Sequence, residues 1–227
     1  EKNRGADNTM QAPLFEMIKE FSGSNPYSYQ VIGSTENLKN PKLSDMKRFY
    51  EQYYVGSNMG LVLCGDFDAS TVMPLLERTF GRIPQGVKPT RRTSPMPAIT
   101  EERTVEVRLP IPLVSMEVLA FKAPTTYDSD ANALDIATRL LTNGQAGMLD
   151  SLNNVHAVAL AGALHTTMND AGATALFVVP KIPFGSMKKA RAKVLTQLER
   201  LMAGDFPDEL LQRQKRILHE MKFVKAL

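Results

Sequence analysis

Residues 45–86 read DMKRFYEQYYVGSNMGLVLCGDFDASTVMPLLERTFGRIPQG, and this segment decides the fold. Large apolar side chains recur at the helical period through its first part, which predicts a helix with one wide apolar face that packs into a core. Those side chains are Met46, Phe49, Tyr50, Tyr53 and Tyr54. We expect Ser44 to cap the start of this helix and Gly56 to end it.

A nearly continuous apolar run follows over residues 58–64. Its length fits a strand, and the absence of polar alternation predicts that both of its faces are covered. Cys64 is therefore expected to be an inert, buried thiol. Asp68 is expected to cap a second helix that ends at about Phe80. A carboxylate pair of Asp66 and Asp68 could serve acid–base chemistry, but a turn and a helix cap explain these residues better.

A linker follows, because residues 86–97 contain three prolines and polar residues without periodicity. We expect the end of one domain over residues 1–86, the linker over 87–100, and most of a second domain over 101–227, truncated at its C-terminal end. The basic pair Arg91 and Arg92 in the linker could mark a protease-sensitive site, but it is interpreted as solvated.

Before the deciding segment, a helix is expected over 10–21 and a long loop over 22–40. After the linker, the expected strands are 104–109, 114–121, 158–164 and 174–179. One helix is expected from about residue 130 to its end at Asn143-Gly144, and further helices over 148–152, 188–202 and 207–227. The last two strands should be antiparallel neighbours joined by a short turn. Strands in pairs followed by helices favour an α+β fold, in which antiparallel sheets carry helices on one face.

Composition excludes several classes of function. The chain has 227 residues, 43% of them hydrophobic, and a net charge of +3 without charged blocks, so it has no electrostatic footprint for nucleic acid. One cysteine rules out an internal disulfide and a cysteine-based zinc cluster. No apolar run approaches the roughly 20 residues that span a bilayer. No signal peptide is visible, but a chain that begins at Glu1 does not test for one.

The order of these pieces resembles the M16 family of zinc metallopeptidases, the insulinase, pitrilysin and mitochondrial processing peptidase group. Residues 43–65 are similar to a family block in which a Tyr-Tyr pair is followed by Asn-Met and then Gly-Asp-Phe. Residues 80–84 are similar to the Phe-Gly-x-Ile-Pro helix end that follows this block. Asn25-Pro26-Tyr27 looks like its His-Pro-Tyr segment, with Asn25 in the histidine place. Residues 128–149 are similar to its second-domain helix and the loop after it.

The resemblance implies M16-like (LuxS/MPP-like) α+β domains arranged as a bilobed chamber around a peptide substrate. The first domain of the family carries an inverted zinc motif, His-x-x-Glu-His, and a glutamate further along completes the site. Two histidines and a carboxylate leave a fourth zinc position open for the water that attacks the peptide. This chain is expected to be a fragment that lacks the motif and covers the end of the first domain and most of the second.

The three histidines of the chain, His156, His165 and His219, are not spaced as that motif, and each is interpreted as an ordinary surface or core residue. No catalytic residue is therefore assigned. Glu1 is the one metal-ligand candidate, because residues 1–8 fit the family's segment around the distal glutamate. In another register of the family the ligand would precede Glu1, which would then be a solvated N-terminal residue.

The resemblance implies a non-catalytic portion of a zinc-dependent metalloendopeptidase that walls the chamber and binds peptide. The parent enzyme would hold zinc, whereas this fragment alone should bind none and cleave nothing. The alternative is a fragment of an inactive homologue with a scaffold or assembly role, and a third interpretation is an unrelated α+β binding module. Expected partners are a peptide or unfolded polypeptide, the remaining domains of the parent, and a second subunit in a homo- or hetero-dimer. Family members range over several compartments, and only analogy favours the bacterial periplasm or export.

Overall fold

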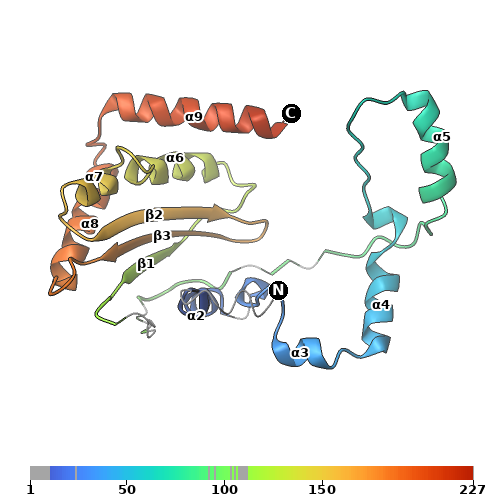
Figure 1. The fold of residues 1–227 in the computed structure, drawn as a ribbon, viewed down its shortest axis with the longest axis horizontal. Coiled ribbons are helices and arrows are strands. Elements are labelled where there is room, and N and C mark those ends of the chain that lie inside the picture. Colours follow the sequence, from blue (N-terminus) through green and yellow to red (C-terminus); the bar gives the residue numbers. More distant parts are fainter. Residues whose placement is uncertain are drawn as a thin grey trace. The chain divides into compact units, whose positions relative to one another are not determined.

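The computed structural model describes residues 11–23, 25–91, 93–94, 96–102, 104, 106 and 112–226 (Figure 1). The chain divides into two compact units. The first, here called the sheet unit, comprises Glu1–Tyr29 and Ser94–Leu227, and the second, the inserted unit, comprises Gln30–Thr93. This division groups the N-terminal residues with the C-terminal region. The predicted domains over 1–86 and 101–227 describe a different partition, which stays a prediction.

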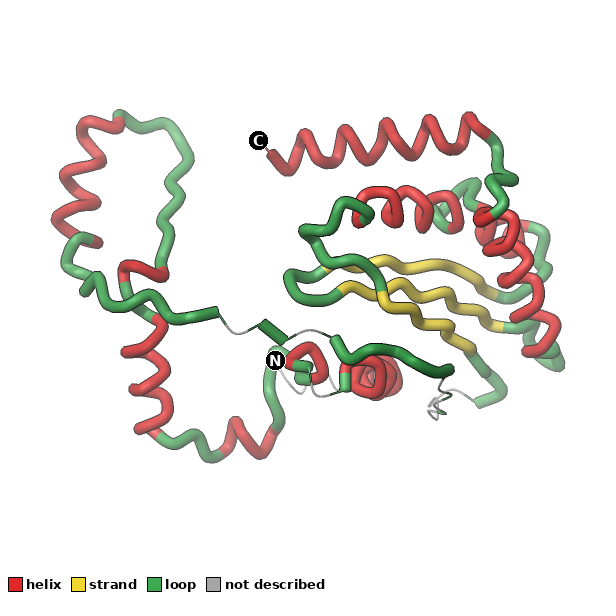
Figure 2. The backbone as a smooth tube through the Cα atoms, turned by 180° about the vertical axis from the view of Figure 1, so that it is seen from behind, coloured by secondary structure: helices red, strands yellow, loops and turns green. Residues whose placement is uncertain are grey.

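The sheet unit is built on three antiparallel strands, β1 (Glu117–Lys122), β2 (Leu160–Thr167) and β3 (Gly172–Val179), in the order β1-β3-β2 (Figure 2). A tight turn joins β2 to β3, with the Met168 N–H donating to the Ala171 carbonyl over 2.7 Å. The predicted antiparallel pairing of these two segments is confirmed. The strand predicted over 104–109 falls largely outside the described residues.

Four helices lie in the described C-terminal part of this unit, and each was predicted from the sequence. They are α6 (Ala131–Leu141), α7 (Met148–Asn154), α8 (Met187–Met202) and α9 (Asp208–Ala226). Helices α6 and α7 contact β2, α8 contacts β3, and α9 packs on α6. The N-terminal helix α2 (Gln11–Ser22) is followed by a short turn of helix, η1 (Pro26–Ser28).

The core lies between the sheet and the helices on one of its faces. Ala161 pairs with Val178 and Ala163 with Leu176, so these four side chains share one face of β2 and β3. They form one buried cluster with residues of α6, α7 and α8, which are Leu141, Met148, Leu149, Ala190 and Val194. The α+β architecture with helices on one face of an antiparallel sheet is therefore confirmed.

The inserted unit contains α3 (Thr35–Lys39), α4 (Leu43–Tyr53), a turn of 3-10 helix, η2 (Gly56–Asn58), and α5 (Ala69–Phe80). The prediction of one long loop over 22–40 is wrong, because Asn25 and Ser34 each accept a backbone N–H with the side chain and so start η1 and α3. Ser44 lies inside α4 instead of capping it. Lys42 is the cap residue, since its carbonyl already accepts the first helical bonds.

The predicted strand over 58–64 is not formed. Residues 59–64 belong to no strand, and Val62 is 92% exposed. A strand requires a neighbouring strand for its N–H and C=O groups, and the described residues of the inserted unit contain none. For the same reason Cys64 is exposed and not buried as predicted.

The aromatic stripe of α4 is likewise exposed, which contradicts its predicted place in a core. Phe49, Tyr50 and Tyr54 have exposed fractions of 57%, 61% and 53%. Among the described residues of the inserted unit, Val55 is the one buried apolar side chain. It lies against Gly86, where the Gly56 N–H donates to the Pro84 carbonyl over 2.9 Å. The inserted unit is thus closed by hydrogen bonds but has no core of its own.

Candidate functional site

The predicted metal ligand Glu1 lies outside the described residues. His156 and His219 are exposed, the first after α7 and the second on α9, while His165 is partly buried on β2. Within the described residues, no three or more histidine, cysteine, aspartate or glutamate side chains are grouped so that they could hold a metal ion. The three histidines lie in different segments of the sheet unit.

His165 has a structural environment. Its Nδ1 lies 2.9 Å from Oγ1 of Thr174 on the neighbouring strand, and its Nε2 is buried without a partner in the described part of the chain. Burial lowers the pKa of this imidazole below its ordinary value of 6.5, against the attraction of the Asp135 carboxylate and a hydrogen bond with the backbone of Ala173. A ring that stays neutral at pH 7 inside a sheet is a packing element.

Of the acidic pair in the inserted unit, Asp68 caps α5, as predicted. The Asp68 carboxylate accepts the Ser70 hydroxyl and, over 3.1 Å, the Thr71 N–H at the start of α5. The Ser70 hydroxyl first, and the backbone N–H groups of Thr71 and Ser70 next, hold the pKa of Asp68 below its ordinary value. A carboxylate that is stabilised as an anion by its cap cannot supply a proton at neutral pH.

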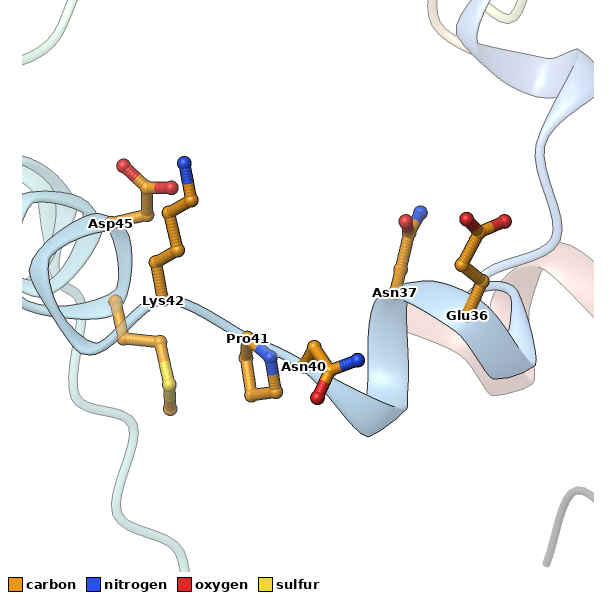
Figure 3. A pocket seen from close by; sticks show the side chains of 7 residues that line it. Glu36, Asn37, Asn40, Pro41, Lys42 and Asp45 are labelled. Atoms are coloured by element: carbon orange, nitrogen blue, oxygen red, sulfur yellow. The ribbon is translucent and has the colours of Figure 1, made fainter.

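An open hollow of about 440 Å³ lies between α3 and α4 (Figure 3). It is lined by Glu36, Asn37, Asn40, Pro41, Lys42, Asp45 and Met46. Figure 3 shows the side chains of Glu36 and Asn37 extending to the same side as those of Lys42 and Asp45. Asp45 is already paired with Arg48 at 2.8 Å, and the surrounding groups are solvated. A hollow of mixed charge and open walls offers no desolvated group for chemistry.

Side-chain hydrogen bonds hold the polar loop that joins α6 to α7. The buried carboxylate of Asp150 accepts the N–H groups of Asn143, over 2.9 Å, and Gly147, over 3.0 Å. The Asn143 side chain accepts two further N–H groups and donates to the Arg139 carbonyl. The glycines of this loop form no phosphate-binding motif, since no Gly-Lys-Ser/Thr follows them. An acidic residue three positions after a helix-starting glycine is the sequence signal for this loop, and the prediction of a plain helix over 148–152 missed it.

Side chains also occupy the outer edge of β2. The Asn153 carboxamide donates to the Ala161 carbonyl over 2.8 Å and accepts the Ala161 N–H over 2.7 Å. The Thr142 hydroxyl accepts the Ala163 N–H over 2.9 Å. These bonds imitate a neighbouring strand, so the first half of this edge is closed to an added peptide strand.

Taken together, the described residues form a scaffold that holds no group of side chains suited to a metal ion. In the described part of the chain, no helix is both long enough and apolar enough to cross a bilayer.

Comparison with known proteins identifies the scaffold. Residues 42–218 match the family profile described as the peptidase M16 inactive domain. The zinc protease PqqE of Helicobacter pylori is 24% identical over 197 residues, which are 84% of this chain and 44% of that protein.

Two solved structures share the fold. A Helicobacter pylori protease superposes with a TM-score of 0.75 at 21% identity over 92% of this chain and 51% of the other. The periplasmic protease PqqL of Escherichia coli superposes with a TM-score of 0.66 at 14% identity over 99% of this chain and 25% of the other. The chain spans about half the length of the relatives it matches first. It belongs to the M16 peptidase family, and the part of that family it represents is the non-catalytic domain.

Proposed function

We propose that this chain is the non-catalytic portion of a zinc-dependent metalloendopeptidase that degrades or processes peptides. The observation that carries the proposal is the match of residues 42–218 to the inactive domain of a peptidase family, in a chain without a His-x-x-Glu-His motif. The likeness to a relative named as a zinc protease supports zinc in the longer enzyme.

Zinc does not fit the described residues, which hold no suitable cluster of ligands. The histidines and the general base of the reaction would come from another part of the longer protein. Glu1 would be the third zinc ligand in the register that matches the family segment. This chain would contribute a wall of the substrate chamber and a surface that binds extended peptide.

The missing core of the inserted unit supports the domain boundaries predicted from the sequence. Its apolar run over 59–64 and its aromatic stripe on α4 are exposed, and exposure of so much apolar surface is unfavourable in water. We propose that residues 1–86 are the C-terminal part of a first domain whose other elements cover these surfaces. Residues 87–100 would be the linker, and 101–227 the second domain.

Cellular location and assembly remain part of the same proposal. The fold likeness to a periplasmic protease supports an exported enzyme. A peptide or unfolded polypeptide would be the substrate, and the remaining domains of the longer chain would be the first partners. A homo- or hetero-dimer would be the assembly expected of the family.

The test is to measure zinc content and hydrolysis of an unstructured peptide for the longer protein and for the 227-residue chain in parallel. We expect the longer protein to bind zinc and cleave the peptide, and the chain alone to do neither. If the longer protein is also inert and free of zinc, the scaffold or assembly role replaces the proposal. Cleavage with stoichiometric zinc by the chain alone would refute it.

The role of Glu1 has its own variant in the same assay. Glu1→Gln in the longer protein should lower zinc retention, since an amide oxygen is a weaker zinc ligand than a carboxylate. Glu20→Gln, at an exposed position on α2, is the matched control and should leave the zinc content unchanged. If both variants retain the same amount of zinc, Glu1 is a solvated residue and not a zinc ligand.

A further inference from the structure

One end of the sheet gathers three loops that carry exposed apolar side chains. The strands β1 and β2 begin at this end and β3 finishes there, because Glu117 and Leu160 pair with Val178 and Val179. Helix α8 starts at the same end (Figure 1).

The exposed apolar residues here are Leu113, Val155, Ile182 and Phe184 in the loops and Leu160 at the start of β2, together called the loop-tip patch. Phe184 is 102% exposed and Leu113 is 88% exposed, so both project fully into solvent. Isolated apolar residues are common on surfaces, but five at one end of a small sheet mark an interaction surface.

Two of the patch residues, Leu113 and Phe184, have an unusual backbone conformation. Leu113, His156 and Phe184 have φ angles of 61°, 53° and 68°, and they are the three non-glycine residues with positive φ in the described part of the chain. Such angles cost free energy for residues with a side chain, and they gather where a loop presents a function. The loop around Phe184 is closed by the Gly185 N–H, which donates to the Lys181 carbonyl over 2.8 Å.

Positive charge adjoins the patch on the loop after β3 and the start of α8. Residues 171–198 contain no aspartate or glutamate but carry Lys181, Lys188, Lys189, Arg191 and Lys193. Arg191 is neutralised by Glu117, at 3.1 Å, and Glu102, at 3.4 Å. Lys181, Lys188 and Lys189 are exposed, and no carboxylate among the described residues pairs with them. The charged rim of the patch is therefore cationic.

We propose that the loop-tip patch docks onto the surface of a bilayer that contains anionic lipids. Separate apolar tips on three loops suit a deformable phase, whereas a folded partner would need a pocket for each of them. The lysines would meet lipid phosphates while Phe184 and Ile182 enter the headgroup region. This attachment is peripheral and is independent of the proposed peptidase role.

The test uses the 227-residue chain in cosedimentation with phosphatidylcholine vesicles, with or without phosphatidylglycerol. We expect binding only to the vesicles with phosphatidylglycerol, and weaker binding as salt rises. Phe184→Ser together with Ile182→Ser should lower partitioning about tenfold. Lys188→Glu together with Lys189→Glu should lower it by at least as much.

Matched controls lie away from the patch. Tyr127, 73% exposed, lies beside the turn that joins β2 to β3 at the opposite end of the sheet, and Tyr127→Ser should leave binding unchanged. Lys215→Glu together with Arg216→Glu on α9 should weaken it far less than the α8 pair. The inserted unit is identical in all these variants, so its exposed apolar surface cannot produce a difference between them.

Three outcomes would overturn the proposal. The first is that the chain does not bind anionic vesicles at low salt. The second is that the patch variants and the control variants lose vesicle binding equally. The third is that the 227-residue chain binds vesicles but the longer protein does not. The last result would identify the patch as an internal interface. Circular dichroism of each variant checks that the fold is retained.

Discussion

At the scale of single residues, the buried carboxylate of Asp150 shows how a charged side chain becomes a structural element. Asp150 is 6% exposed and accepts N–H groups at both ends of the loop between α6 and α7. Removing a buried acceptor leaves its donors unsatisfied, which costs more than the hydrogen bonds contribute when they are formed.

We predict that Asp150→Ala lowers the free energy of unfolding by about 1–3 kcal/mol, because the N–H groups of Asn143 and Gly147 lose their acceptor. Urea unfolding followed by circular dichroism measures the change. The control is Asp130→Ala, since Asp130 precedes α6 without a side-chain capping bond and should cost about 0.5 kcal/mol or less. Equal losses in the two variants would contradict the role of Asp150.

His165 predicts a pH dependence of stability. Because its pKa is lowered in the folded chain, the unfolded chain binds the proton more readily. The stability that depends on the neutral ring is fully present above the ordinary pKa of 6.5, and it is lost as pH falls through the lower folded value. We expect the melting temperature to fall below pH 6.5, and to fall less in His165→Gln. An unchanged pH dependence in His165→Gln would show that another group causes the loss of stability.

At the scale of elements, the stability of the sheet depends on how the backbone groups at the outer edge of β2 are satisfied. An edge strand with free N–H and C=O groups invites pairing with another chain. Here α7 supplies Asn153, whose carboxamide satisfies both backbone groups of Ala161. The helix therefore stabilises the sheet by hydrogen bonds as well as by the packing of Leu149 in the core.

Asn153→Ala should lower the free energy of unfolding by about 1–2 kcal/mol, because two hydrogen bonds to the strand edge are lost. It should also speed hydrogen exchange of the Ala161 amide, and mass spectrometry measures this exchange. Asn154→Ala is the matched control, because Asn154 is exposed and makes one long bond of 3.3 Å to Gln145. If both variants exchange alike at Ala161, the edge is protected by packing alone.

At the scale of the whole molecule, the two units differ in what stabilises them. The sheet unit has a buried cluster that joins β2 and β3 to α6, α7 and α8. The inserted unit has a single buried apolar side chain, Val55, among its described residues. Since apolar burial is the main favourable term in folding, the inserted unit is expected to be stable only when other chain covers it.

We predict fast amide exchange at residues 59–64 in the 227-residue chain and slow exchange there in the longer protein, where the segment would pair as a strand. Exchange measured by mass spectrometry compares the two proteins. Residues 172–179 of β3 serve as the internal control, since they are paired on both sides and should be protected in both. Protection of 59–64 in the chain alone would show that the inserted unit completes itself.

Local signals were enough to predict much of this protein. The helical period located α6, α8 and α9, and the turn between β2 and β3 identified these strands as antiparallel neighbours. Asp68 was recognised as a cap. The sequence alone also shows that this chain lacks a His-x-x-Glu-His motif. Each of these features depends on residues within a few positions of one another, so sequence alone determined them.

Tertiary structure decided the features that depend on distant chain. The apolar run at 59–64 has the composition of a strand, but a strand forms only where another strand pairs with it. The stripe on α4 and Cys64 were predicted to lie in a core, yet burial is a property of what packs against a side chain. The loop-tip patch was invisible for the same reason, because Leu113, Val155 and Phe184 come together only when the sheet aligns the ends of its strands.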